Sequence, residues 1–383
     1  MGRNVVKEEF MKYFDYKGKK VSRLGFGCMR FKTLDDDNGK IDKEYSSEII
    51  KEAIDKGLTY IDTAYPYHNQ MSEKFIGEFI EENDLRDKVT IATKMPVWLV
   101  NSYEDYERIF KEQLANLRTD YFDFYLIHSL DKKKFDQAVE NGLFDFIKVI
   151  KEKGLVKNIG FSFHDEYPVF EEIIKSYPWD FCQIQLNYLD INLQAGMKGY
   201  TLAKEMGIPL VIMEPVKGGR LANPPREVKD LMRGSDLSPA QMALKFVLDL
   251  DNVMTVLSGM NDIDQVRENL AIADAIEPGS LDDDDRDFYR KARAIYKSRE
   301  QIACTACEYC LPCTVDINIP KVFALWNNAH LYDEKEKSQK AYIEYLKDGV
   351  SPEECIECGK CEGICPQSLE IIEGLKKANE YLR

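Results

Sequence analysis

Two runs of closely spaced cysteines stand near the C-terminal end of the chain. They read Cys304-x2-Cys307-x2-Cys310-x2-Cys313 and Cys355-x2-Cys358-x2-Cys361-x3-Cys365-Pro366, and they contain eight of the ten cysteines in the 383 residues. Thiolates ligate iron and zinc, and gaps of two residues let several thiolates reach one metal centre. A secreted disulfide scaffold would instead spread its cysteines through a short chain. The spacing therefore predicts metal ligation.

The kind of metal site follows from how the runs are built. Zinc is the alternative for any pair of Cys-x2-Cys units, but a zinc site needs only four thiolates. It gains nothing from three successive steps that end in Cys-Pro. The second run resembles that of bacterial ferredoxins with two iron–sulfur clusters. This resemblance implies two [4Fe–4S] clusters, ligated by Cys304, Cys307, Cys310, Cys313, Cys355, Cys358, Cys361 and Cys365.

The same resemblance implies how the cysteines divide between the clusters. In two-cluster ferredoxins, three closely spaced cysteines bind one cluster and the fourth, before proline, binds the other. Cys365 would then join the cluster of the first run, and Cys313 would join the cluster of the second. The first run departs from the ferredoxin pattern, with two residues before Cys313 rather than three and Thr314 where proline is usual. Two self-contained quartets therefore remain the alternative.

A second set of residues could carry acid–base chemistry. Asp62 ends the run LTYID, Tyr67 lies in the next loop, Lys94 ends VTIATK, and His128 ends YFDFYLIH. Each of them alone has an ordinary structural explanation, such as a cap, a packed loop residue or a structural histidine. Together, a carboxylate, a phenol, an ammonium and an imidazole could move a proton to or from a reacting oxygen.

These residues must be placed by the elements around them. From residue 21 to about 275, short apolar runs alternate with longer amphipathic ones. The expected strands are Arg23–Cys28, Thr59–Asp62, Val89–Lys94, Phe122–His128, Val156–Phe161, Phe181–Leu186, Pro209–Met213 and Thr255–Ser258. A helix is expected after each strand, which predicts an α/β fold of the (β/α)8 TIM barrel type, with its chemistry at the C-terminal strand ends. A doubly wound sheet is the alternative, but no Gly-x-Gly-x-x-Gly follows the first strand.

The rest of the chain is expected to be organised differently. The acidic run at 277–287, EPGSLDDDDRD, indicates an exposed boundary. We predict a barrel over residues 1–280, a helical linker over 281–300 and a dicluster [4Fe–4S] domain over 301–383. This last domain should be small and mostly helical, with helices at Val322–Ala329 and Lys337–Lys347 between the cysteine runs.

The sequence from about residue 21 to 275 resembles the aldo/keto reductase family. The resemblance rests on IDTAYPY, ATK, DFYLIH, IGFSF, CQIQLNY, MEPVKGGRL and QVRENL. It implies a catalytic tetrad of Asp62, Tyr67, Lys94 and His128. Tyr65 is a rival for the tyrosine, but the family places it five residues after the aspartate, which selects Tyr67.

The tetrad suits the reduction of a carbonyl group. Hydride transfer leaves negative charge on the carbonyl oxygen, so a proton donor has to be close. A phenol has an unperturbed pKa of about 10, and we expect the ammonium of Lys94 to lower the pKa of Tyr67. Asp62 would keep Lys94 charged, and His128 would orient and polarise the carbonyl oxygen.

A nicotinamide cofactor, NADPH or NADH, is implied by the same resemblance. The expected cofactor contacts are Ser162, Gln183, Met213, Gly259, Gln265 and Asn269. Phe163 stands where the family usually has asparagine, with His164 next to it. Many relatives bind the NADP 2′-phosphate with a lysine and an arginine, where this chain has Gly259 and Gln265, and Arg267 is the only cation nearby in the sequence. We therefore expect NADH to be used at least comparably to NADPH.

Composition and charge limit the partners. Hydrophobic residues make up 44%, charged residues 31%, and the net charge is −15, which is ordinary for a globular protein but unfavourable for binding nucleic acid or anionic lipid. No apolar run is long enough to span a membrane, and the first residues lack a signal-peptide core. We expect a cytoplasmic protein that binds neither nucleic acid nor membrane, with Cys28 and Cys182 as buried structural residues.

Three functions are compatible with these features. The first is an oxidoreductase that transfers hydride between a nicotinamide cofactor and a small carbonyl or alcohol substrate, with the clusters serving electron relay or structure. The second is an electron-transfer protein that links the barrel to a ferredoxin-like redox partner. It would need a flavin between two-electron and one-electron chemistry, and we recognise no flavin motif. The third is a barrel kept as a binding subunit, and the intact tetrad weighs against it.

Overall fold

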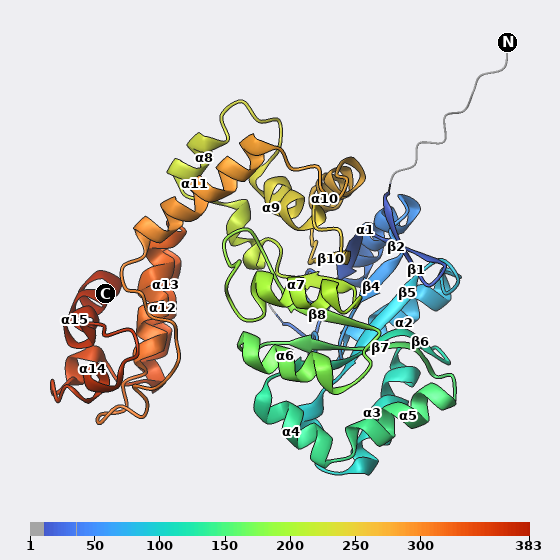
Figure 1. Cartoon of the computed structure of the whole chain (residues 1–383), viewed down its shortest axis with the longest axis horizontal. Helices are drawn as coiled ribbons and strands as arrows, with labels where there is room; N and C mark the ends of the chain where they lie inside the picture. Colours follow the sequence, from blue (N-terminus) through green and yellow to red (C-terminus); the bar gives the residue numbers. More distant parts are fainter. Residues whose placement is uncertain (1–10, 36) are drawn as a thin grey trace. The chain divides into compact units, whose positions relative to one another are not determined.

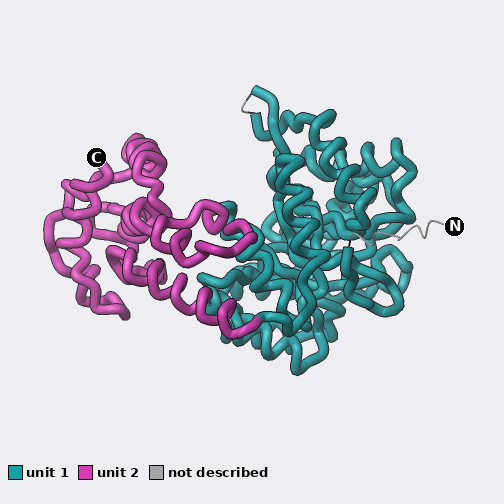
Figure 2. The backbone as a smooth tube through the Cα atoms, turned by 90° about the horizontal axis from the view of Figure 1, so that it is seen from above, with its two compact units in different colours: residues 1–219, 240–281 teal, residues 220–239, 282–383 magenta. Residues whose placement is uncertain are grey.

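The computed structural model describes residues 11–35 and 37–383. The described chain forms two compact units, drawn in two colours in Figure 2. Unit 1 runs to Gly219 and continues over Ala240–Leu281, and unit 2 comprises Arg220–Pro239 and Asp282–Arg383. The residues expected to form a linker are mostly one helix, which belongs to unit 2. The domain boundaries at 280 and 300 remain our proposal.

Unit 1 is built on a closed barrel of eight parallel strands (Figure 1). The strands are β3 (Leu24–Gly27), β4 (Tyr60–Asp62), β5 (Thr90–Met95), β6 (Phe122–Leu130), β7 (Val156–Phe163), β8 (Phe181–Gln185), β9 (Leu210–Met213) and β10 (Val253–Ser258). Each strand pairs with the next along the chain, and β10 closes the barrel on β3. Nearly all strand residues are buried, because side chains fill the interior and helices cover the outside. The predicted (β/α)8 barrel is confirmed.

Helices follow the strands and form the outer layer. They are α1 (Lys43–Asp55), α2 (Ser72–Glu82), α3 (Tyr103–Asn116), α4 (Lys132–Glu140), α5 (Leu143–Glu152), α6 (Tyr167–Ser176), α7 (Gly196–Glu205), α9 (Pro239–Leu248) and α10 (Ile263–Ala275), with short 3-10 turns η1 (Val97–Leu99) and η2 (Lys217–Ala222). In α5 the buried residues are Leu143, Phe146, Ile147 and Ile150. They recur every three or four residues, so one face of the helix packs on the barrel.

A hairpin that the sequence did not predict closes the N-terminal end of the barrel. Strands β1 (Tyr13–Tyr16) and β2 (Lys19–Ser22) pair antiparallel. Tyr16 and Val21 from this hairpin join a buried cluster with Tyr60, Phe124 and other residues from the starts of the barrel strands. The Tyr16 hydroxyl donates to the backbone oxygen of Asp180 at 2.7 Å. The hairpin therefore seals the end of the barrel opposite to the strand ends that carry Asp62 and Lys94.

Unit 2 is helical and has its own core. Its elements are α8 (Arg226–Leu231), α11 (Asp283–Arg299), α12 (Ile319–Leu331), α13 (Lys335–Asp348), the turn η3 (Pro352–Glu354), α14 (Lys360–Ile364) and α15 (Ile371–Leu382). Phe323 and Trp326 of α12 pack with Tyr342 and Leu375, and six of the clustered cysteines lie against this core. The predicted small, mostly helical C-terminal domain is confirmed. No helix in the described ranges of the chain combines the length and apolar composition that crossing a membrane requires.

Candidate functional site

The barrel brings Asp62 and Lys94 together at neighbouring strand ends. Asp62 is the last residue of β4, and Lys94 lies near the end of the adjacent β5. The ammonium of Lys94 donates to the two carboxylate oxygens of Asp62 at 2.8 and 2.7 Å and to the backbone oxygen of Thr63 at 2.8 Å. These three contacts hold the ammonium in one position in the barrel interior.

Tyr67 approaches the same ammonium from the loop after β4. The Lys94 Nζ atom lies 5.1 Å from the centroid of the Tyr67 ring. The next three residues, His68, Asn69 and Gln70, all have left-handed backbone conformations, with φ of 52, 52 and 67°. Such a run in residues other than glycine is costly and is held by surrounding contacts; here the Phe31 amide donates to His68 Nε2 at 3.2 Å. The loop is therefore fixed in the shape that presents Tyr67.

Tyr65, the rival phenol, lies elsewhere. Its hydroxyl donates to Glu112 of α3 at 2.9 Å, whereas Tyr67 meets Lys94. The two tyrosines are only two residues apart in the loop, yet their side chains have different neighbours. The structure thus brings Asp62, Tyr67 and Lys94 together and leaves Tyr65 outside this group.

Burial and charge act in opposite directions on the protons of this group. Burial raises the pKa of Asp62, and the adjacent Lys94 opposes that rise. Burial alone would lower the pKa of Lys94, but Asp62 and Tyr67 raise it above its usual value. For Tyr67, burial raises the pKa, and the opposing effect of Lys94 does not cancel it. The expected net lowering of the Tyr67 pKa is therefore wrong in the ligand-free chain, although Lys94 acts in the expected direction.

His128 lies beside the phenol on β6. Its ring centroid is 6.2 Å from that of Tyr67 and 5.1 Å from that of Trp98. Burial, together with the positive charge of Lys94, lowers the pKa of His128 well below its usual value, so the imidazole is neutral at pH 7. Its Nδ1 atom is buried without a hydrogen-bond partner. A neutral ring with an unused nitrogen can take a polar ligand next to Tyr67.

A buried polar network behind Lys94 was missed by the sequence reasoning. Glu73 of α2 accepts from Thr93 at 2.6 Å and from Gln113 of α3 at 2.7 Å, and Gln113 also donates to the backbone oxygen of Lys94 at 3.0 Å. Burial raises the pKa of Glu73. The network ties β5 to two covering helices. Its only sequence signal is a polar residue on each apolar helix face.

Ser162, Gln183 and Met213 lie on three adjacent strands. Ser162 faces Gln183 in the register of β7 and β8, and its hydroxyl accepts from the Ser129 amide at 2.7 Å. The Gln183 amide nitrogen contacts the Met213 sulfur at 3.4 Å, while its Oε1 atom is buried without a partner. This open acceptor, together with the Ser162 hydroxyl, suits a carboxamide group such as that of nicotinamide.

Phe163 and His164 differ in their surroundings. Phe163 is fully buried and packs edge-on against Phe170 of α6, so it belongs to the apolar layer between strand and helix. The His164 amide donates to the Leu130 backbone oxygen at 2.8 Å, and burial lowers the pKa of its imidazole. Phe163 therefore offers no polar contact at this strand end.

The predicted residues near the last strand have local partners. Gln265 accepts from the Asn261 amide at 3.2 Å, Asn269 donates to Ser258 at 3.0 Å, and Arg267 pairs with Glu52 of α1 at 3.1 Å. Arg267 is thus already engaged on the outside of the barrel. A carboxylate, Asp262, caps α10 nearby.

Arg30, which the sequence reasoning overlooked, is the cation that lies against Gly259. A Cβ atom on Gly259 would come within 2.9 Å of Arg30 Cδ, and one on Gly218 would lie 3.2 Å from Arg30 Nη2. The guanidinium therefore lies between the loops that follow β9 and β10. The sequence did not predict this neighbourhood, because Arg30 follows the first barrel strand and lies far along the chain from Gly218 and Gly259. Lys217, in the loop after β9, is by contrast paired with Asp190.

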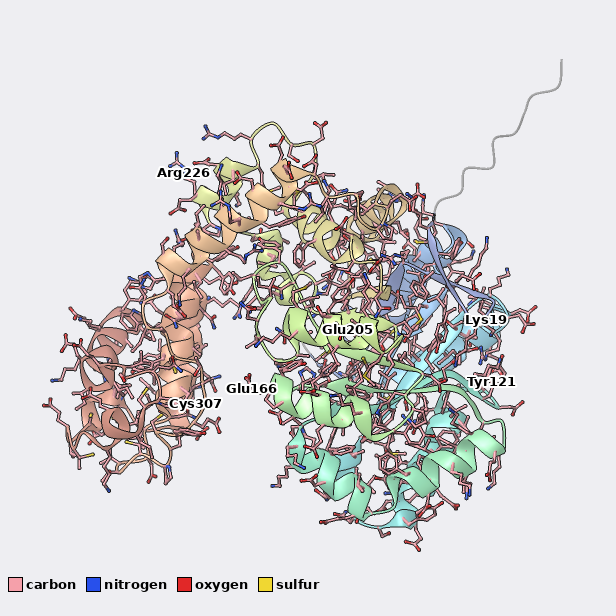
Figure 3. All side chains as sticks on the ribbon, in the orientation of Figure 1. Lys19, Tyr121, Glu166, Glu205, Arg226 and Cys307 are labelled. Carbon is pink, nitrogen blue, oxygen red and sulfur yellow. The ribbon has the colours of Figure 1, made fainter. Side chains whose placement is uncertain are left out.

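The clustered cysteines of unit 2 line two cavities. One cavity, of about 20 Å³, is lined by Cys304, Cys307, Cys310 and Cys365 among others. The other, of about 330 Å³, is lined by Cys313, Cys355, Cys358 and Cys361, and also by Cys310. Cys307, labelled in Figure 3, and Cys358 are exposed, and the other six are partly exposed. Cys28 and Cys182, by contrast, are fully buried in unit 1.

The smaller cavity thus gathers three cysteines of the first run and the last cysteine of the second run. The larger cavity gathers three cysteines of the second run and the last cysteine of the first run. Four thiols around one hollow match in number the four iron corners of a cubane cluster. Within 11–35 and 37–383, no group of three His, Cys, Asp or Glu side chains is arranged to hold a single metal ion.

Comparison with protein families agrees with both halves of the chain. Residues 23–278 match the aldo/keto reductase family, and residues 303–370 match the 4Fe-4S dicluster domain. The first match covers all eight barrel strands, and the second covers all eight clustered cysteines.

Individual proteins are more distant. The uncharacterized oxidoreductase YqkF of Bacillus subtilis is 25% identical over 288 residues, which is 67% of this chain and 88% of YqkF. The structure of the aldo-keto reductase AKR11C1 from Bacillus halodurans, holo form, has a TM-score of 0.61 and 25% identity over 74% of this chain and 96% of that one. An aldo-keto reductase from Klebsiella pneumoniae in complex with NADPH shares the fold, with a TM-score of 0.61 and 19% identity over 74% of this chain and 95% of that one.

Proposed function

The chain belongs to the aldo/keto reductase family and carries a C-terminal 4Fe-4S dicluster domain, and from this premise we propose that it transfers hydride between a nicotinamide cofactor and a small carbonyl or alcohol substrate. The observation that carries the proposal is that Tyr67 lies next to a Lys94 ammonium that both oxygens of Asp62 hold. This arrangement supports Tyr67 as a proton donor beside the strand ends, where barrel enzymes carry out their chemistry.

In the proposed reduction, Tyr67 gives its proton to the carbonyl oxygen as that oxygen becomes negative. The pKa of Tyr67 is raised by burial, so the phenol is protonated at neutral pH and ready to donate. The phenolate that remains is stabilised by the Lys94 ammonium. In the oxidation of an alcohol, the same phenolate takes the proton back. Asp62 acts through Lys94 and is a positioning residue in this scheme.

His128 directs the carbonyl group. Its neutral imidazole has a buried nitrogen without a partner, so it can hydrogen-bond the substrate oxygen without adding charge. Trp98, 39% exposed and packed against His128, would form part of the substrate wall. We therefore expect a substrate small enough to pass the Trp98 indole and reach His128.

The residues that would hold the nicotinamide ring are Ser162, Gln183 and Met213. They fit the carboxamide because Gln183 Oε1 is a buried acceptor without a partner. When bound, the reduced cofactor supplies the hydride. Gly259, Gln265 and Asn269 remain our proposed contacts for the distant end of the cofactor, with NADH used at least comparably to NADPH.

Two [4Fe–4S] clusters are proposed for the dicluster domain, with Cys304, Cys307, Cys310 and Cys365 holding one and Cys313, Cys355, Cys358 and Cys361 holding the other. The two cavities with these lining residues support this division. The clusters would accept and release single electrons or stabilise the fold. None of the ten cysteines, all of which lie in the described part of the chain, is joined in a disulfide, which suits the reducing cytoplasm that we propose as the location.

One observation favours a second function, electron exchange with a ferredoxin-like partner. Tyr309, Ile356 and Ile364 line the larger cysteine cavity and are 62, 60 and 55% exposed. Apolar side chains that remain exposed beside a redox centre could contact a partner protein. This function would require a flavin or another carrier that divides a two-electron hydride into single electrons.

The test is anaerobic purification of the full chain, followed by cofactor and metal analysis. We expect iron and sulfide in equal amounts, no flavin, and oxidation of NADH or NADPH by small aldehydes or ketones. Stoichiometric flavin with bleaching of the cluster absorption by NADH would favour the second function. A chain that binds nicotinamide but reduces no carbonyl in a broad panel would contradict the first.

A further inference from the structure

A hydroxyl–sulfur contact distinguishes the larger cysteine cavity from the smaller one. Thr314 Oγ1 lies 3.4 Å from Cys358 Sγ, and both residues line the larger cavity. With a free thiol, either atom could be the donor. A metal-bound cysteine has lost its proton, so with iron present the Thr314 hydroxyl has to donate to the sulfur.

The smaller cavity lacks an equivalent donor for a reason that is visible in the sequence. Thr314 follows Cys313, and the corresponding residue after Cys365 is Pro366, which lines the smaller cavity and has neither a hydroxyl nor an amide hydrogen. Thr305 also lines that cavity, but in the described structure its side chain makes no hydrogen bond to a cysteine sulfur. Among the described residues, the hydrogen bond of a threonine hydroxyl to a cysteine sulfur thus distinguishes the larger cavity from the smaller.

We propose that Thr314 raises the reduction potential of the cluster held by Cys313, Cys355, Cys358 and Cys361 above the potential it would have without this hydroxyl. The inference rests on the proposed clusters. When the oxidised centre takes up one electron from a reductant, negative charge increases on its thiolate ligands, and no covalent bond is made or broken. A hydrogen bond donated to one of these sulfurs is stronger after reduction, so it favours the reduced form.

The consequence is a bias on the electron within the domain. With the hydroxyl, the cluster beside Thr314 accepts an electron more readily than it would without it. The exposed apolar residues Tyr309, Ile356 and Ile364 line this same cavity. Thr314 therefore acts through the Cys358 sulfur and is a positioning residue.

The test is a potentiometric titration of the anaerobic, cluster-loaded full chain with dithionite, followed by electron paramagnetic resonance and visible absorption. We expect Thr314→Val to lower one potential only, by an amount that makes the equilibrium constant for one-electron uptake about three- to tenfold smaller; a tenfold change is 59 mV for one electron. Thr314→Ser, which keeps the hydroxyl, should retain the wild-type potential. Thr305→Val is the matched control and should leave both potentials unchanged.

Several results would overturn the inference. These are a shift smaller than twofold in Thr314→Val, an equal shift of both clusters, or a Thr314→Ser variant that behaves like Thr314→Val. If Thr314→Val fails to assemble its cluster, electron–nuclear double resonance of the reduced wild-type chain in H2O and D2O decides: an exchangeable hydrogen close to the centre is expected, and its absence contradicts the hydrogen bond. Iron and sulfide analysis comes first, because a wild-type chain with far fewer than about eight iron atoms contradicts the proposed function itself.

Discussion

The ammonium of Lys94 lies 2.8 and 2.7 Å from the two carboxylate oxygens of Asp62, in a barrel interior where the two residues are 0 and 3% exposed. Removing one member of such a pair leaves an uncompensated charge in a medium that solvates it poorly. The pair therefore contributes both to the stability of the barrel and to the charge that acts on Tyr67, the proposed proton donor.

Substitution of Asp62 should lower both the stability of the barrel and the rate of catalysis. We expect Asp62→Asn to lower the free energy of unfolding by about 3 kcal/mol and kcat by roughly a hundredfold or more. The matched control is Asp136→Asn, which removes one of the two carboxylate partners of Lys132 from an exposed pair at 2.8 Å and should leave the free energy of unfolding almost unchanged. Urea unfolding and steady-state kinetics measure both. If the two substitutions had equal effects, the buried pair would contribute no more to stability and catalysis than the exposed pair.

Removal of the phenol should separate catalysis from binding. We expect Tyr67→Phe to lower kcat about 10²- to 10⁴-fold, while the Kd for the nicotinamide cofactor, measured by fluorescence titration, changes less than about twofold, because the ring is kept. Tyr65→Phe removes a hydroxyl of the same loop that contacts Glu112 instead, and it should retain most of the turnover. A Tyr67→Phe enzyme with near-normal kcat would refute the tetrad.

The pKa of His128 predicts a pH dependence of stability. Because burial holds this pKa well below 6.5, the unfolded chain binds a proton near pH 6.5 while the folded chain does not. The unfolded state therefore binds more protons between the two pKa values, and stability falls as the pH drops through 6.5. Above about pH 7.5 neither state binds this proton, and the effect is absent.

The His128→Asn variant isolates this contribution. From pH 7 to pH 5, the wild type should lose about 2 kcal/mol more than the variant does. Hydrogen exchange of the barrel strands in mild urea measures the difference within unit 1. Parallel stability curves for the two proteins over this range would mean that the imidazole titrates normally in the folded chain.

Cofactor selectivity should depend on Arg30 rather than on Arg267. Arg30 lies between Gly218 and Gly259, whereas Arg267 is paired with Glu52. We expect kcat/KM for NADH to be at least comparable to that for NADPH. Arg30→Ala should weaken the binding of both cofactors about tenfold through the phosphates that they share. Arg267→Ala should leave both Kd values within about twofold, and a selective loss of NADPH in Arg267→Ala would relocate the 2′-phosphate site.

The residues that could be predicted from the sequence are those whose position follows from a repeated element. Asp62, Lys94 and His128 all follow apolar runs of strand length, so the barrel pattern alone places them at the same end. The strand pattern does not decide between Tyr65 and Tyr67, because that choice depends on how one loop turns, and only the family resemblance selected Tyr67. Three left-handed residues after Tyr67 make that turn, and no glycine marks it.

Other parts of the fold lacked a sequence signal. Strands β1 and β2 are short and mix charged and aromatic residues, so their packing under the barrel depends on tertiary contacts of Tyr16 and Val21. Glu73 is buried by partners on another helix and another strand, and a single polar residue on a helix does not predict them. The same holds for Arg30, whose neighbours Gly218 and Gly259 lie far along the chain.

The division of the cysteines between the clusters can be tested by pairs of substitutions. In the proposed arrangement, Cys304 and Cys365 serve one cluster, because both line the smaller cavity, and Cys355 serves the other. Cys304→Ala combined with Cys365→Ala should therefore remove one cluster and retain about four iron atoms. Cys355→Ala combined with Cys365→Ala should remove both.

Two self-contained quartets predict the opposite pattern. In that case the pair Cys355→Ala and Cys365→Ala would spare one cluster, and the pair Cys304→Ala and Cys365→Ala would lose both. The control is Cys304→Ala with Cys355→Ala, which removes one ligand from each cluster in either arrangement and should leave little iron. Iron and sulfide content after anaerobic reconstitution gives the answer. Because crossed ligation ties the two runs together across helices α12 and α13, loss of either cluster should also destabilise unit 2 as a whole, which thermal unfolding of the same variants would show.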